Sequence, residues 1–145
     1  MSRKSHLLGR LLHCEKGMAA LEFILIAPAL FALIFMIVIY SFYFAAVMGV
    51  RQAAAEGARA AVAGISISQR EELATNRANA VIDAYGSLLA AGGGAQPTTI
   101  SNDPVGTFKV RVTYDISQST LYDYSFIPMP PSPIIATTVV TNGSY

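Results

Sequence analysis

Reactive side chains are scarce in this 145-residue chain. The only cysteine, Cys14, and both histidines, His6 and His13, lie close to the N-terminus. Downstream of Gly17 the chain therefore has no thiol and no imidazole, which removes the usual general base, the usual nucleophiles and the usual zinc ligands. That part also cannot form a disulfide. We therefore expect no enzymatic activity, no metal site and no other cofactor.

Charge is equally scarce, since Asp, Glu, Lys and Arg make up 13% of the residues. Four of the ten basic residues precede Gly17, and the rest of the chain is slightly acidic. No basic surface for nucleic acid is predicted. The 28 residues between Glu22 and Arg51 carry no charge at all.

This uncharged run is long enough to cross a bilayer, because about 20 helical residues cover a hydrocarbon core of about 30 Å. We predict one transmembrane helix over residues 18–50. It is much longer than the apolar region of a removable secretory signal, which is about 7 to 15 residues. The positive-inside rule puts the N-terminus in the cytoplasm and the C-terminal domain outside it. The basic residues before the span are Arg3, Lys4, Arg10 and Lys16.

The helical pattern continues beyond the span over residues 51–64. This segment is rich in alanine and favours helix, with Gly57 as a weak point and Gly64 as a stop. Pro28, early in the span, predicts a kink because its ring removes one backbone donor. The alanines between residues 53 and 61 allow close approach either of the chain's own sheet or of a neighbouring helix.

Residues 65–145 predict a small α+β domain with a second helix and a short antiparallel sheet. A capping box of Ser68 and Glu71 predicts the start of the helix, which extends through Leu88 and Leu89 to the glycines at 92–94. Pro97 then predicts a turn. Residues 108–116 alternate apolar and polar side chains as a strand does, 134–141 is rich in β-branched residues, and 98–101 is a weaker strand candidate.

Between the two stronger strand candidates, residues 121–133 form an apolar, proline-rich segment that is too irregular for a strand. Burial against the home domain is the simplest interpretation. The alternative is a docking patch for a partner, made of Tyr122, Tyr124, Phe126 and Met129.

Glu22 lies at the edge of the apolar run, where a carboxylate needs a partner or water. Cleavage after Gly17 would supply an ammonium at Met18, one helical turn away. If the ammonium came from a neighbouring subunit, packing in register would be favoured, because a slipped neighbour would leave a buried charge unpaired. The alternative is that Glu22 simply reaches the headgroup level.

The basic leader, Gly17, Met18, Glu22, Phe23 and the apolar helix together resemble a prepilin-type processing site of the type IV pilin superfamily. With Pro28 and the Ala55–Arg59 segment, they more narrowly resemble TadE-like pseudopilins of tight adherence (Flp) pilus systems. The resemblance implies a leader over residues 1–17, removed by a prepilin peptidase in the bacterial inner membrane. It also implies contact with TadF-like subunits, Flp pilin and an inner-membrane assembly platform.

Major Flp pilins are much shorter and have Glu-Tyr where this chain has Glu22-Phe23. The resemblance therefore favours a minor, pilin-like component over the repeating subunit. The alternative is an unprocessed single-span protein whose envelope domain binds another partner. The residues considered as catalytic carboxylates and amine are better explained as helix, turn and strand residues; they are Glu71, Glu72, Asp103 and Lys109.

Overall fold

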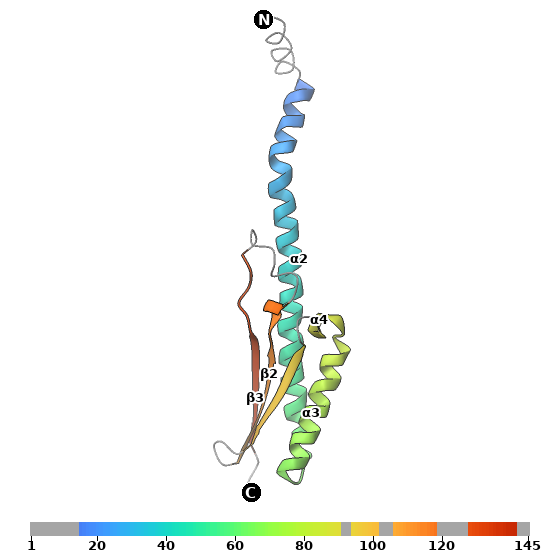
Figure 1. The fold of residues 1–145 in the computed structure, drawn as a ribbon, viewed down its shortest axis with the longest axis vertical. Helices are drawn as coiled ribbons and strands as arrows, with labels where there is room; N and C mark the ends of the chain where they lie inside the picture. The colour runs from blue at the N-terminus through green and yellow to red at the C-terminus, as the bar shows by residue number, and fades with distance from the viewer. Residues whose placement is uncertain (1–14, 91–93, 102–105, 119–127, 142–145) are drawn as a thin grey trace, which may run out of the picture. The chain divides into compact units, whose positions relative to one another are not determined.

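The computed structural model describes residues 15–90, 94–101, 106–118 and 128–141. Its elements are a long helix and two shorter ones, three strands and a 3-10 turn (Figure 1). This confirms the predicted α+β class. The chain divides into two compact units, up to Val38 and from Ile39, which are described separately. The elements are α2 (Glu15–Ala61), α3 (Ile67–Ala84), α4 (Ser87–Ala90), β1 (Ala95–Ser101), β2 (Thr107–Tyr114), η2 (Ile116–Gln118) and β3 (Ile134–Thr141).

The unit up to Val38 contributes only α2 to the described residues. The helix runs through Pro28 without ending there. The proline has no amide hydrogen to donate to the carbonyl of Ile24, and the predicted kink at this position stays a prediction. Within the described part of the chain, α2 is the one helix long and apolar enough to cross a membrane. It therefore fits the anchor of a single-pass membrane protein.

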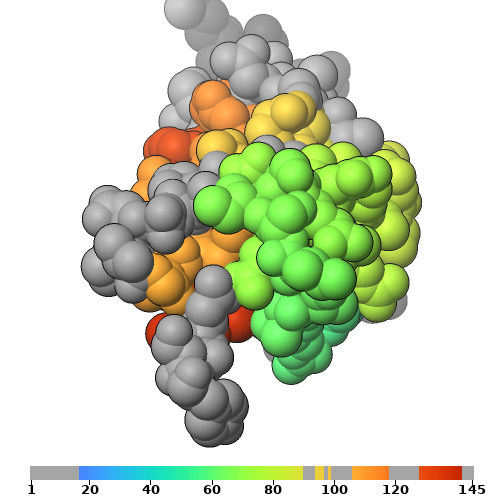
Figure 2. Space-filling view, turned by 90° about the horizontal axis from the view of Figure 1, so that it is seen from below, coloured from blue at the N-terminus to red at the C-terminus, as the bar shows by residue number. Residues whose placement is uncertain are grey.

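In the unit from Ile39, the antiparallel sheet in the order β1-β2-β3 packs against α2 and α3. Val112 and Tyr114 of β2 share one buried cluster with Ala46 and Val50 of α2. A second cluster joins the C-terminal part of α2 to α3 and β2, which lie against each other in Figure 2. Alanines supply most of the α2 side chains in the two clusters, and their small size brings the sheet close to the axis of α2.

The alanines of α2 thus pack on the chain's own domain, which is the first of the two interpretations given by the sequence. Ala53, Ala54, Ala58 and Ala61 are at most 1% exposed. Helix α2 ends at Ala61, before the stop predicted at Gly64, and the amide of Gly64 donates to the carbonyl of Ala61. Gly64 therefore follows a short turn rather than capping the helix directly.

The strand predictions are largely confirmed. Phe108, Val110, Val112 and Tyr114 of β2 are buried, and their neighbours are more exposed. β3 has the bounds that were predicted. Ile116 is not part of the strand, because the chain turns into η2 after Tyr114.

β1 begins at Ala95, so the turn predicted at Pro97 is wrong. Pro97 pairs with Val112 inside the strand. A proline is tolerated there because β1 is an edge strand and one side of its backbone needs no ladder partner.

The start of the second helix is also corrected. Ser66, not Ser68, is the N-cap, and its hydroxyl accepts a hydrogen bond from the amide of Gln69 at 3.2 Å. The Gln69 side chain in turn accepts from the amide of Ile65 at 3.0 Å. The predicted box of Ser68 and Glu71 is therefore wrong by two residues, because Ser66-Gln69 satisfies the same spacing earlier in the chain.

The second helix ends at Ala84, before the glycines that were predicted to end it. Gly86 has a φ of +52°, a left-handed conformation that suits glycine, and α4 follows. This turn places Leu89 fully in the core, and the hydroxyl of Tyr114 donates to the carbonyl of Leu88 at 3.0 Å. Burial raises the pKa of the Tyr114 hydroxyl, so that it remains a donor.

Candidate functional site

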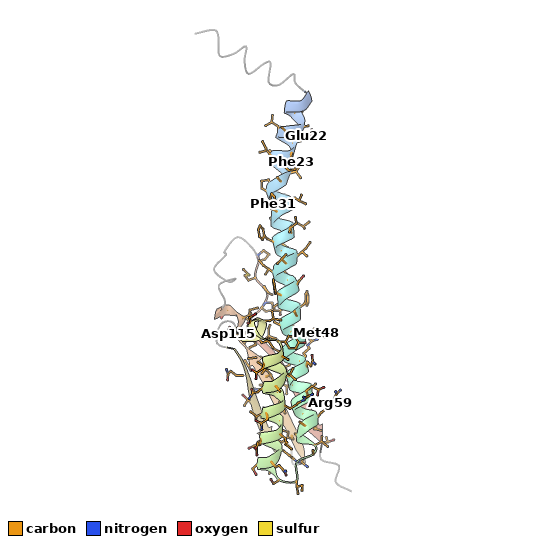
Figure 3. All side chains as sticks on the ribbon, turned by 90° about the vertical axis from the view of Figure 1, so that its right-hand side faces the viewer. Glu22, Phe23, Phe31, Met48, Arg59 and Asp115 are labelled. Atoms are coloured by element: carbon orange, nitrogen blue, oxygen red, sulfur yellow. The ribbon has the colours of Figure 1, made fainter. Side chains whose placement is uncertain are left out.

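The predicted processing junction lies in the first described turns of α2 (Figure 3). Gly17 is partly exposed, Met18 is 48% exposed, and Glu22 is exposed. Met18 and Glu22 are four residues apart in the helix, so they project from the same face. No other described element covers them. Within the described residues, the carboxylate of Glu22 is therefore open to its surroundings.

The helix around this junction exposes apolar side chains in every direction. Phe23 is 67% exposed and Leu25 is 82% exposed, values that are typical of a surface that faces lipid or other apolar helices rather than water. The large apolar residues exposed in this unit are Met18, Leu21, Phe23, Ile24, Leu25, Ile26, Leu30, Phe31, Leu33, Ile34, Phe35, Met36, Ile37 and Val38.

Only part of the predicted aromatic patch can be placed. Tyr122, Tyr124 and Phe126 lie outside the described residues, whereas Met129 is partly buried and follows the exposed Pro128. The hydroxyl of Tyr40 donates to the carbonyl oxygen of Pro128 at 3.2 Å. This end of the segment is therefore attached to α2.

Sequence reasoning did not single out Tyr40. The only signal was an aromatic cluster near the end of the apolar run, where Tyr40, Phe42, Tyr43 and Phe44 follow one another closely. Tyrosine at such a position is typical of a membrane interface.

A polar cluster around Asp115 lies where β2 ends and β3 begins. Oδ1 of Asp115 accepts hydrogen bonds from the Ser117 hydroxyl at 2.6 Å, the Ser132 hydroxyl at 2.8 Å and the Ser117 amide at 3.0 Å. These bonds, led by that of the Ser117 side chain, lower the pKa of the Asp115 carboxyl. The cluster joins η2 to the residues that lead into β3.

Asp115→Asn is expected to weaken the domain slightly near neutral pH. Because the folded pKa is lower than the ordinary value of 3.8, the ionised carboxylate contributes stability above that value, and this contribution is lost as the pH falls through the folded pKa. Urea unfolding of the full-length protein in detergent is followed from pH 6 down to about pH 3. The free energy of unfolding should fall less steeply with pH in the variant than in the wild type. Glu72→Gln, which changes an exposed carboxylate of α3, is the control; an equal change of slope in both would contradict the role of the cluster.

Comparison with known proteins adds a decisive observation at the junction. Residues 17–59 match the model of the TadE-like protein family. This segment is TadE-like. The resemblance predicted from the junction is confirmed over this range. The TadE-like segment begins at Gly17 and covers α2 almost to its end.

The TadE-like segment indicates a membrane protein associated with Tad (Flp) pili. The sheet, α3 and α4 lie outside the matched residues. Neither a search of curated proteins nor a search of solved structures found a match.

Proposed function

We propose that this protein is a minor pilin-like component, a pseudopilin, of a Tad (Flp) pilus assembly or secretion apparatus. Its role is structural rather than catalytic. The observation that carries the proposal is the TadE-like match, which begins at Gly17, the residue predicted to precede the cleaved bond. The exposed apolar surface of α2 after Gly17 supports it, because an assembly component of this kind must be stored in lipid.

In this proposal a prepilin peptidase cleaves between Gly17 and Met18 on the cytoplasmic side of the bacterial inner membrane. The bond lies inside α2, so the peptidase must unwind that turn to reach it. Gly17 makes the unwinding easier, because glycine costs a helix about 1 kcal/mol relative to alanine. The new ammonium of Met18 then becomes available to the carboxylate of Glu22.

The partners that follow from this role are the prepilin peptidase, TadF-like subunits, Flp pilin, the inner-membrane assembly platform and membrane lipid. In this proposal the small domain from Ile39 onward faces the extracytoplasmic side, which the basic residues of the leader favour.

Mass spectrometry of the N-terminus of the native protein tests the proposal. The wild type is expected to begin at Met18, and Gly17→Leu is expected to keep the leader and to lose pilus assembly, because the side chain obstructs the peptidase. Gly9→Leu makes the same change within the leader and should be processed normally. A wild-type protein that begins at Met1 or Ser2 would instead indicate an unprocessed single-span protein with a partner-binding envelope domain.

A further inference from the structure

The uncharged run of α2 is too long for the bilayer it has to cross. Its 28 residues extend about 42 Å as a helix, whereas the hydrocarbon core is about 30 Å thick. About eight residues must therefore lie outside the hydrocarbon, at one end of the run or the other.

The structure indicates which end lies outside. Ala46 and Val50 are fully buried, in a cluster that includes Ala95 of β1 and Ile134 of β3. β1 and β3 are the two edges of an open sheet, and open sheet edges do not occur in lipid hydrocarbon because their backbone groups would lack partners. The hydrocarbon must therefore end before Ala46, and a count of about 18 to 21 residues from Phe23 ends between Tyr40 and Tyr43.

The residues at this level have the character of a membrane interface. Phe42 is 51% exposed and Phe44 is 61% exposed, and the ring of Phe44 packs edge-to-face on Tyr43 with centroids 5.8 Å apart. Tyrosine and tryptophan collect where hydrocarbon meets headgroups, and Tyr40 and Tyr43 lie in this part of α2. Through the hydrogen bond of Tyr40, the exposed Pro128 and the adjacent Met129 are held at the same level.

We propose that Tyr40, Phe42, Phe44, Pro128 and Met129 form a lipid-headgroup surface, on which the unit from Ile39 is seated directly against the extracytoplasmic leaflet. The occupant is phospholipid because the surface continues the apolar exposed side chains of α2, which leave no gap of polar helix before the domain begins. The hydrocarbon part of the helix then runs from about residue 23 to about residue 40, which is shorter than the span 18–50 predicted from hydrophobicity alone. The inference goes beyond the pilus role and does not depend on it.

The absence of tryptophan from the chain makes a direct test possible. Single tryptophans are placed in the full-length protein at Ile34, Phe44, Met48, Pro128 and Met129, and at Ile65, which is 94% exposed on the turn after α2. The variants are reconstituted in vesicles of phosphatidylcholine and phosphatidylglycerol that carry bromine either near the headgroup or deep in the acyl chain.

Deep bromine is expected to quench Ile34→Trp most strongly, and shallow bromine to quench Phe44→Trp, Pro128→Trp and Met129→Trp. Ile65→Trp is the matched control and should not be quenched. Pro128→Trp keeps the carbonyl that accepts from Tyr40, so it reports on the same surface if Met129→Trp fails to fold. Circular dichroism of each variant verifies its helix content.

Two results would overturn the inference while leaving the membrane anchor intact. The first is the absence of quenching at both Pro128→Trp and Met129→Trp while Ile34→Trp is quenched, because the domain would then face water or protein. The second is deep quenching of Met48→Trp, since Met48 is 61% exposed on α2 and the hydrocarbon would then extend past the sheet. Absence of quenching at Ile34→Trp would refute the membrane anchor as well.

Discussion

Gly57→Leu is expected to unfold the domain from Ile39 onward in most molecules. A β-carbon at Gly57 would lie 2.9 Å from the backbone oxygen of Ala74 and 3.3 Å from side-chain atoms of Ala78 and Val110. The backbone oxygen belongs to α3 and cannot move without moving that helix. A leucine there costs about 3 kcal/mol or more, which is a large part of the stability of a small domain.

The smaller change Gly57→Ala separates helix propensity from packing. Alanine favours a helix by about 1 kcal/mol over glycine, so a helix considered alone would become more stable. We expect the protein to be less stable, because the contact with the oxygen of Ala74 outweighs this gain. Gly57 was a weak point in the sequence pattern, and the structure shows that its missing side chain lets α2 lie directly against the backbone of α3.

Gly49→Ala in the same helix is the matched control. Its β-carbon would lie 2.9 Å from side-chain atoms of Leu89 and Tyr85 rather than from backbone, so a shift of these side chains can relieve the contact without moving a helix. Urea unfolding of the full-length protein in detergent should therefore give a smaller loss of unfolding free energy for Gly49→Ala than for Gly57→Ala. The reverse order would show that the approach at Gly57 is looser than the structure has it.

The sequence predicted best those elements in which buried and exposed side chains alternate regularly. β2 alternates because one face rests on α2, and each side chain from Phe108 to Tyr114 follows the period of two. β3 was delimited by its β-branched residues between Pro133 and Asn142. The small residues of α2 predicted a close contact, and the structure identifies the sheet as what they contact.

Local signals were less reliable where two candidates competed. Ser66 and Ser68 both have a polar residue three positions later, so the spacing alone could not decide the cap. Three consecutive glycines at 92–94 were a stronger breaker than Gly86, yet the chain turns at Gly86 because Leu89 must reach the core. That requirement is tertiary, and no local pattern contains it.

The candidate site also combines a local motif, which the sequence predicted, with a long-range contact, which it did not. Gly17, Met18 and Glu22 form a local motif, and the family match begins within it. The hydrogen bond from Tyr40 to Pro128 joins residues 88 positions apart, so no local pattern contains it. Sequence alone therefore predicted the junction but could not predict where the domain meets the end of the span.

Glu22→Gln is expected to leave processing intact and to abolish assembly. The amide keeps the size of the side chain but cannot neutralise the ammonium of Met18, which then stays unpaired wherever helices pack in lipid. Breaking a buried pair in this way costs about 3 to 5 kcal/mol, and association should fall by about 100-fold or more. The measurements are the N-terminal mass, which should still begin at Met18, and recovery of the protein in cross-linked complexes with pilin-like subunits.

Glu56→Gln is the matched control, because it makes the same change in the same helix. Glu56 pairs with Arg59 at 3.0 Å and with Arg77 at 3.4 Å, and both arginines are more than half exposed. Such surface pairs contribute about 0 to 1 kcal/mol, so assembly should be nearly unchanged. If Glu22→Gln assembles as well as Glu56→Gln, then Glu22 reaches water or headgroups and does not meet an ammonium in lipid. Processing would then serve to remove the leader rather than to create a charge partner.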